Sequence, residues 1–134
     1  MPETVVFDSF ALLAFLRDEP GADLVEEILN EAARRADPVW MTEINYAEVK
    51  YILLRKHGED RWAAFARAIS GIPIRFVSVG RRISDRAADL KANHKLSLAD
   101  ACTAALAMEL EASVVTGDRE FKALSDRIEV VWLR

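Results

Sequence analysis

Four acidic side chains stand at positions in this sequence where carboxylates can meet and bind a metal ion. Asp8 and Asp118 each follow a short apolar run that is typical of a buried strand, Glu48 falls within a helical pattern, and Asp100 opens another helix. Hard cations such as Mg²⁺ prefer oxygen ligands and keep several of their waters. Four carboxylates that converge on one cleft can hold one or two such ions, which is the equipment for metal-assisted hydrolysis of a phosphodiester.

Three of these acids also have a purely structural explanation. Asp8 can cap the helix that follows it, because an N-cap Asp accepts hydrogen bonds from unpaired backbone N–H groups. Asp100 stands three residues after Ser97, which is the spacing of a capping box. The Gly–Asp pair at Asp118 favours a turn. Capping and metal binding are compatible, since a first-turn carboxylate can still project into a cleft at the strand ends.

Glu48 is the most informative of the four because its helical neighbours are largely apolar. The residues three and four positions away are Ile44, Asn45, Tyr51 and Ile52. A glutamate on an apolar stripe is rare, since an unpaired buried charge is costly. We therefore expect Glu48 to have a partner, which is either a metal ion or a basic residue such as Arg55 in a structural ion pair.

Other kinds of catalytic site find little support in the sequence. The glycine-rich motifs of dinucleotide sites and P-loops do not occur. The two histidines are His57, which we interpret as a structural residue at a helix end, and His94, which we expect in an exposed loop. Cys102 is the single cysteine, so an internal disulfide is excluded. Its helical position predicts a small buried side chain.

Length and composition predict one domain over residues 1–134. Hydrophobic residues make up 51% and charged residues 30% of the chain, as in soluble globular proteins. No apolar run approaches the roughly 18 residues of a membrane span, and the first residues lack the basic segment of a signal peptide, so we expect a cytoplasmic protein. The formal net charge of −4 argues weakly against nucleic acid, but the four candidate ligands account for it.

Predicted strands alternate with predicted helices along the chain. Strand patterns occur at residues 4–7, 39–41, 74–79, 113–116 and 128–133. Helical patterns occur at residues 10–17, 21–36, 42–57, 62–69, 83–90 and 98–111, with a helical turn at 120–124. Gly58 has the C′ position that ends a helix. This alternation predicts a three-layer α/β/α fold with a central parallel sheet of about five strands.

Four stretches of the chain together resemble the PIN-domain family, and specifically its VapC-type ribonuclease toxins of toxin–antitoxin pairs. The stretches are residues 5–13, 42–49, 94–101 and 114–121. They come in the family's order and extend over nearly the whole chain. The resemblance implies a single PIN-like nuclease domain, with a twisted parallel sheet and helices on both faces.

The resemblance also implies a site and a set of partners. The family's acidic metal ligands and catalytic residues fall on Asp8, Glu48, Asp100 and Asp118, and possible site-lining residues on Ser9, Asn45 and Thr116. The implied activity is cleavage of RNA with Mg²⁺ or Mn²⁺ by a homodimer. The implied partner is a VapB-type antitoxin that blocks the acidic cleft. We expect that antitoxin to place a basic residue among the carboxylates, because a guanidinium pairs with them and excludes the cation.

Functions of other classes fit parts of the pattern. A non-cleaving RNA- or protein-binding module can keep the acidic cleft as a docking surface. A phosphatase of haloacid-dehalogenase type also has an Asp after the first strand, but it expects a second Asp where this chain has Phe10. A receiver-like domain expects an acidic pair where only Asp8 stands.

Two kinds of surface are expected to contact partners. Each of four basic pairs is either a local phosphate contact or an ordinary solvated face, namely Arg34 and Arg35, Arg55 and Lys56, Arg81 and Arg82, and Arg119 and Lys122. For Arg34 and Arg35 we favour the solvated face. The apolar stripe of the helix at residues 21–36, together with Tyr46 and Tyr51, is expected to serve association.

Overall fold

Five parallel strands form the centre of the computed structural model, which describes residues 4–134. They are β1 (Val5–Phe7), β2 (Val39–Thr42), β3 (Ile74–Val77), β4 (Ser113–Thr116) and β5 (Val130–Trp132). The order in the sheet is β3-β2-β1-β4-β5, and every neighbouring pair is parallel. The predicted parallel sheet of five strands is confirmed.

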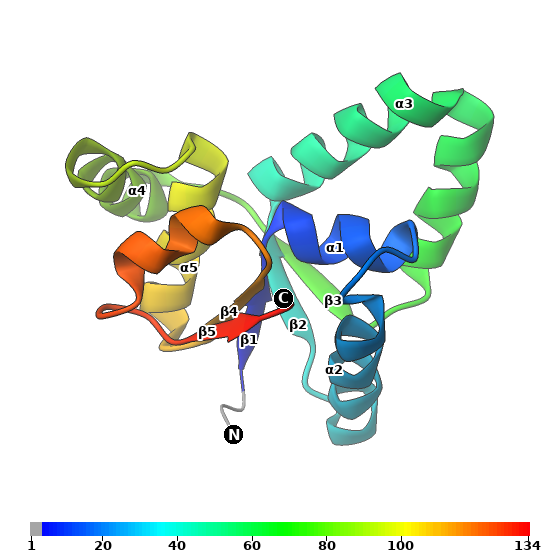
Figure 1. Ribbon diagram of the computed structural model, residues 1–134, viewed down its shortest axis with the longest axis horizontal. Coiled ribbons are helices and arrows are strands. Elements are labelled where there is room, and N and C mark those ends of the chain that lie inside the picture. Colours follow the sequence, from blue (N-terminus) through cyan, green and yellow to red (C-terminus); the bar gives the residue numbers. More distant parts are fainter. Residues whose placement is uncertain (1–3) are drawn as a thin grey trace.

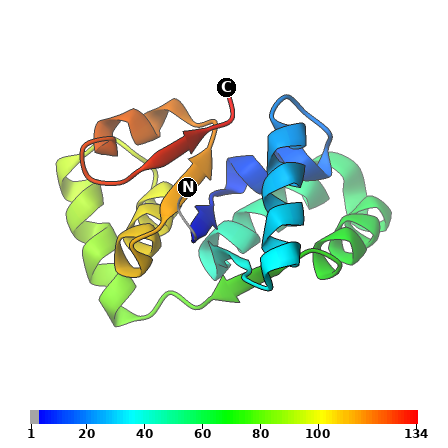
Figure 2. The ribbon, with the colours of Figure 1, turned by 90° about the horizontal axis from the view of Figure 1, so that it is seen from below.

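Helices cover both faces of this sheet (Figure 1). One face carries α1 (Ser9–Leu16), α2 (Ala22–Arg35) and α3 (Glu43–Ser70), and the other carries α4 (Arg81–Asn93), α5 (Leu98–Leu110) and the 3-10 helix η1 (Arg119–Leu124). Figure 2 shows the two groups on opposite sides of the strands. The three-layer prediction is therefore confirmed. Within residues 4–134, no helix has the length and apolar character needed to cross a membrane.

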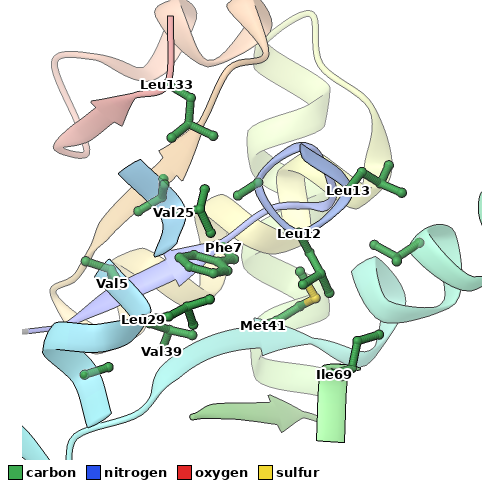
Figure 3. Packing of buried hydrophobic residues seen from close by; sticks show 14 of the residues in the cluster. Val5, Phe7, Leu12, Leu13, Val25, Leu29, Val39, Met41, Ile69 and Leu133 are labelled. Carbon is green, nitrogen blue, oxygen red and sulfur yellow. The ribbon is translucent and has the colours of Figure 1, made fainter. Parts of the chain in front are cut away.

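The sheet separates two apolar cores, because successive side chains of a strand point to opposite faces. Val5 and Phe7 pack against α1 and α2, whereas Val6 packs against the α5 side. In Figure 3, Phe7 lies next to Val25 and Leu29 of α2. Burial on both faces explains why β1 is an unbroken apolar run instead of an alternating one.

The strand order reverses between β1 and β4. From β1 the chain moves outward through β2 to β3, and it then returns to the other side of β1 to form β4 and β5. In open parallel sheets, ligands bind beyond the carboxyl ends of the strands at such a switch point. Phe7 pairs with Val115, so the next residues of the two strands, Asp8 and Thr116, reach the same edge.

Helix α3 bends sharply at Gly58, whose φ of 83° and ψ of 174° are not helical. A positive φ favours glycine, and the predicted helix end at this residue is confirmed. A second helical limb follows directly, so that α3 passes over α1 and turns back towards β3 (Figure 1).

Two strands are shorter than the sequence predicts by two residues or more. The strand expected at residues 74–79 ends at Val77, because its partner β2 ends at Thr42 and the chain there enters α3. The strand expected at residues 128–133 is limited to Val130–Trp132, the part that pairs with β4.

Candidate metal centre

A cleft of about 390 Å³ opens at the carboxyl edge of the sheet, beside the switch point. Its carboxylates belong to Asp8, Glu48, Asp100, Asp118 and Glu120, and its other lining residues are Ser9, Phe10, Leu13, Ile52 and Ser97. The fold thus brings together all four acids singled out in the sequence and adds a fifth.

Asp8 is fixed at the end of β1, where its side chain is 1% exposed. Its Oδ1 accepts a hydrogen bond from the Ala11 N–H at 2.9 Å and so caps α1, while Oδ2 accepts one from the Thr116 hydroxyl. Burial, and to a smaller degree the nearby Asp118 and Glu48 carboxylates, raises the pKa of Asp8 to about 7 against the effect of these hydrogen bonds. Asp8 is both a helix cap and a candidate ligand.

Thr116 connects the ends of β1 and β4 from a fully buried position. Besides donating to Asp8, its hydroxyl oxygen accepts a hydrogen bond from the Asp118 N–H at 2.8 Å. Asp118 Oδ1 in turn accepts from the Glu120 N–H at 2.9 Å and caps η1. Thr116 therefore lies behind the cleft and sets the position of two of its acids.

Glu48 reaches the cleft from α3, but its surroundings differ from the predicted apolar stripe. Ile44 and Tyr51 are 43% and 48% exposed, so these neighbours of Glu48 on α3 do not pack into the core. The Ser9 hydroxyl donates a hydrogen bond to Glu48 Oε1. Arg55, the alternative partner considered for Glu48, lies over the Tyr51 ring, 5.3 Å from its centre.

A buried polar network holds Ser9 in place. Asn45 is fully buried, and its Nδ2 donates to Ser9 Oγ at 3.1 Å. Its Oδ1 accepts hydrogen bonds from Thr103 Oγ1 at 2.9 Å and from the Thr42 hydroxyl. Satisfied buried networks of this kind rigidify their surroundings. Asn45 thus lies one layer behind the cleft and orients Glu48 through Ser9.

Asp100 enters the cleft from the first turn of α5. Ser97 Oγ caps this helix by accepting from the Asp100 N–H at 3.1 Å. The second contact of the predicted capping box is made by another residue, because the Ser97 N–H donates to Glu120 Oε1 at 3.2 Å. Burial, a hydrogen bond with Asp118 and repulsion from Asp118, Asp8 and Glu120 raise the pKa of Asp100 well above its usual range.

The donor set suits a hard divalent cation. Within residues 4–134, one carboxylate oxygen from each of Asp100, Asp118 and Glu120 lies within 4.8 Å of the other two. All available ligands are oxygens, as Mg²⁺ and Mn²⁺ prefer. The raised pKa values of Asp8 and Asp100 reflect burial and crowded negative charge, and a bound cation would relieve that repulsion.

Glu120 is not among the acids that the sequence patterns single out, because its position in the sequence is only weak evidence for a metal ligand. It stands two residues after Asp118 at the start of a predicted helical turn, and acids are common in first turns. Its contact with Ser97 spans 23 positions, so it depends on the packing of η1 against α5. A second acid close behind a strand-end Asp is the one hint that the sequence contains.

The histidines and the cysteine lie outside the cleft. Contrary to the expectation of an exposed loop residue, His94 is half-buried at the end of α4, with Nδ1 3.0 Å from the Leu90 carbonyl oxygen. It helps to close that helix. The His57 ring packs against Phe65, with 5.7 Å between the ring centres. Cys102 is buried as predicted, which raises the pKa of its thiol.

The fold and the acidic cleft agree with the family comparison. The family model of the PIN domain matches residues 5–127. The chain belongs to the PIN domain family. Comparison with curated proteins gives no match.

Solved structures with the same fold include several toxin–antitoxin proteins. DNA-bound VapBC from Salmonella typhimurium aligns with a TM-score of 0.80 at 14% identity, covering 98% of each chain. A toxin–antitoxin complex from Klebsiella pneumoniae aligns at 0.69 and 22% identity, covering 97% of this chain and 98% of the other. VapC20 from Mycobacterium tuberculosis, a sarcin-ricin loop cleaving toxin, aligns at 0.69 and 17% identity, covering 89% and 93%. At these identities the likeness establishes the shared fold.

Proposed function

We propose that this protein is an endoribonuclease that depends on Mg²⁺ or Mn²⁺ and acts as the toxin of a type II toxin–antitoxin pair. The observation that carries the proposal is the convergence of five carboxylates in one cleft at the switch point of a PIN domain. RNA as the substrate class is supported by the description of the similarly folded VapC20 as a toxin that cleaves the sarcin-ricin loop.

The residues proposed to hold the cation are Asp8, Glu48, Asp100 and Asp118, and Glu120 is a fifth candidate because its carboxylate lies close to those of Asp100 and Asp118. When bound, the cation supplies charge neutralisation at the phosphate and a nucleophilic water at neutral pH. The protein contributes ligands that are already oriented, because Thr116 fixes Asp8 and Ser9 fixes Glu48. Supporting hydrogen bonds of this type tune metal affinity.

Protons compete with the cation for this cleft. Asp8 and Asp100 have raised pKa values, so both retain protons near neutral pH when no cation is present. Binding of the cation must release these protons. We therefore expect cleavage to increase as pH rises from about 6 to about 8.

Cleavage of RNA by the purified protein in Mg²⁺ tests the proposal. Asp8→Asn keeps the shape of the side chain but removes its charge, and we expect it to cut RNA at least about 100-fold more slowly than wild type. Asp126→Asn removes the same charge from an exposed turn and should cut normally. Equal rates for Asp8→Asn and wild type would overturn the assignment. If cleavage depends on Asp8 as expected, sequencing of RNA ends after controlled expression identifies the cut site.

An antitoxin partner and a homodimer belong to the same proposal, as does a cytoplasmic location. Similarly folded structures are described as a DNA-bound VapBC and a toxin–antitoxin complex. Within residues 4–134, the large apolar side chains that are exposed are Ile44, Tyr51 and Leu98. They lie close in sequence to Glu48 and Asp100, so a partner segment that crosses the cleft would cover them.

The antitoxin is proposed to place a basic residue among the carboxylates. Its binding should then weaken as Mg²⁺ is titrated at fixed ionic strength, because cation and guanidinium compete for the same oxygens. An affinity that stays constant over the titration would contradict this competition. Analytical ultracentrifugation of the protein alone tests the homodimer.

A further inference from the structure

Arg134 is fixed beside the acidic cleft by two contacts. Its Nε donates a hydrogen bond to the Gly117 carbonyl oxygen at 3.2 Å. Its guanidinium carbon lies 4.9 Å from the centre of the Phe10 ring. Phe10 lines the cleft, and Gly117 directly precedes Asp118. The positive charge of Arg134 is therefore held at the rim of the site.

Close packing of Phe10 on Gly117 makes this arrangement possible. A Cβ at position 117 would lie 2.3 Å from Phe10 Cε1, so the ring rests directly against the glycine backbone. The ring in turn attracts the guanidinium through a cation–π contact. Phe10, Gly117 and Arg134 thus form one packed unit next to the candidate ligand Asp118.

Within the part of the chain that the structure describes, the outer donors of Arg134 make no hydrogen bond. Within residues 4–134, its contacts are the hydrogen bond to Gly117 and the ring of Phe10. A guanidinium has five N–H donors in a planar fork that matches two phosphate oxygens. Because the fork is already oriented, less freedom is lost when it binds.

We infer that Arg134 binds a phosphate of the RNA strand at the Phe10 wall of the cleft and so positions the substrate. The inference rests on the proposed function. The cleft itself repels RNA through its carboxylates, so the strand needs a cationic contact outside the metal position. Arg134 provides one within the same wall. The sequence already suggested Arg119 as a candidate phosphate contact. Its guanidinium carbon lies 5.6 Å from the centre of the Trp132 ring, whereas that of Arg134 lies over Phe10.

The test combines equilibrium binding with steady-state cleavage. Binding of a short fluorescent single-stranded RNA is measured in EDTA at several salt concentrations, and KM and kcat are measured in Mg²⁺. For Arg134→Gln we expect RNA binding weakened about tenfold and KM raised similarly, with kcat nearly unchanged. The slope of log K against log salt should become shallower by about 0.7, the value for one phosphate contact on a single strand.

Two further variants make the result specific. Arg134→Lys keeps the charge and loses the fork, so its RNA affinity should fall between wild type and Arg134→Gln. Arg127→Gln removes an exposed arginine that lines a different pocket, beside α4 and α5, and should leave RNA affinity and the salt slope unchanged.

Several outcomes would overturn the inference. If wild type cleaves RNA while Arg134→Gln and Arg127→Gln behave alike, Arg134 is not a phosphate contact and the proposed function stands. If Arg134→Gln instead tightens Mn²⁺ binding and leaves RNA affinity unchanged, Arg134 is a counter-charge to the carboxylates. If wild type neither binds nor cleaves RNA, the inference falls together with the proposed function.

Discussion

The hydroxyl of Thr116 donates a hydrogen bond to the carboxylate of Asp8 across 108 positions of sequence. This contact joins the carboxyl ends of β1 and β4, the two strands between which the sheet order reverses. The same hydroxyl accepts the Asp118 N–H, so one side chain sets the spacing of two candidate ligands. The location of the acidic cleft therefore follows from the strand order.

Thr116→Val tests this role because it keeps the β-branched shape and removes the hydroxyl. We expect the free energy of unfolding to fall by about 1–3 kcal/mol, since a buried Asp8 oxygen and the Asp118 N–H lose their partner. The pKa of Asp8 should rise further, because this hydrogen bond lowers it, and Mn²⁺ affinity at about pH 7 should drop. Urea denaturation and titration calorimetry measure both effects. Thr116→Ser is the matched control and should retain Mn²⁺ affinity; the account would be wrong if Thr116→Val retained it as well.

Stability of the metal-free protein should depend on pH. A carboxyl whose pKa is higher in the folded than in the unfolded state binds more protons when folded. The stabilising contribution of Asp8 is fully present below its unfolded pKa of 3.8 and is lost as pH rises through about 7. Asp100, whose folded pKa is also raised, extends this loss to higher pH.

In EDTA, the thermal midpoint of wild type should therefore fall between about pH 5 and about pH 8. Asp100→Asn should show a smaller fall and be the more stable protein at about pH 8, because it lacks the carboxyl that keeps its proton in the fold and ionises on unfolding. Saturating Mn²⁺ should restore wild type at the alkaline end. Parallel midpoint curves for the two proteins would contradict the assigned pKa shift of Asp100.

Asn45→Ala should damage both the fold and the site. It removes the partner of the buried Thr103 hydroxyl and the donor that holds Ser9, so we expect a loss of about 2–3 kcal/mol in the free energy of unfolding. Mn²⁺ affinity should fall roughly tenfold, since Ser9 no longer orients Glu48. Asn30→Ala, on the exposed face of α2, is the control for calorimetry and denaturation. Unchanged Mn²⁺ affinity in folded Asn45→Ala would remove Asn45 from the support of the site.

Gly117→Ala should destabilise the protein by about 1–3 kcal/mol, because the added methyl group meets the Phe10 ring. Phe10→Leu in the same background frees space and should recover part of the loss. Denaturation of the two single variants and the double variant forms a double-mutant cycle. Strictly additive effects would show that Phe10 and Gly117 do not interact as the packing requires.

Local sequence patterns predicted most of the framework, since they report on burial within one element. The unbroken apolar run of β1 and the glycine at position 58 each carry a local signal that the fold preserves. Asp8 and Asp100 could be placed at the switch-point edge because the strands and helices around them were predictable. Glu120 and Arg134 could not be placed from the sequence. The position of Glu120 depends on its contact with Ser97 and that of Arg134 on its contact with Gly117, and both contacts exist only after the elements pack.

The surroundings of Glu48 show a second limit of pattern analysis. Apolar neighbours at helical spacing indicate a shared face, but they do not tell whether that face meets the core or an open cleft. Ile44 and Tyr51 share the face of Glu48 and are exposed. The unusual glutamate was correctly noticed, although the buried setting expected for it was wrong.

Titration calorimetry with Mn²⁺ at about pH 7.5 tests the central claim most directly, namely that the converging carboxylates form a divalent-cation site. For wild type we expect one or two ions to bind with release of protons, which is detected by repeating the titration in buffers of different ionisation enthalpy. Asp100→Asn should weaken binding by more than about tenfold, whereas Asp126→Asn should match wild type. An absence of Mn²⁺ binding to wild type at millimolar concentrations would contradict the account and favour a non-cleaving binding module.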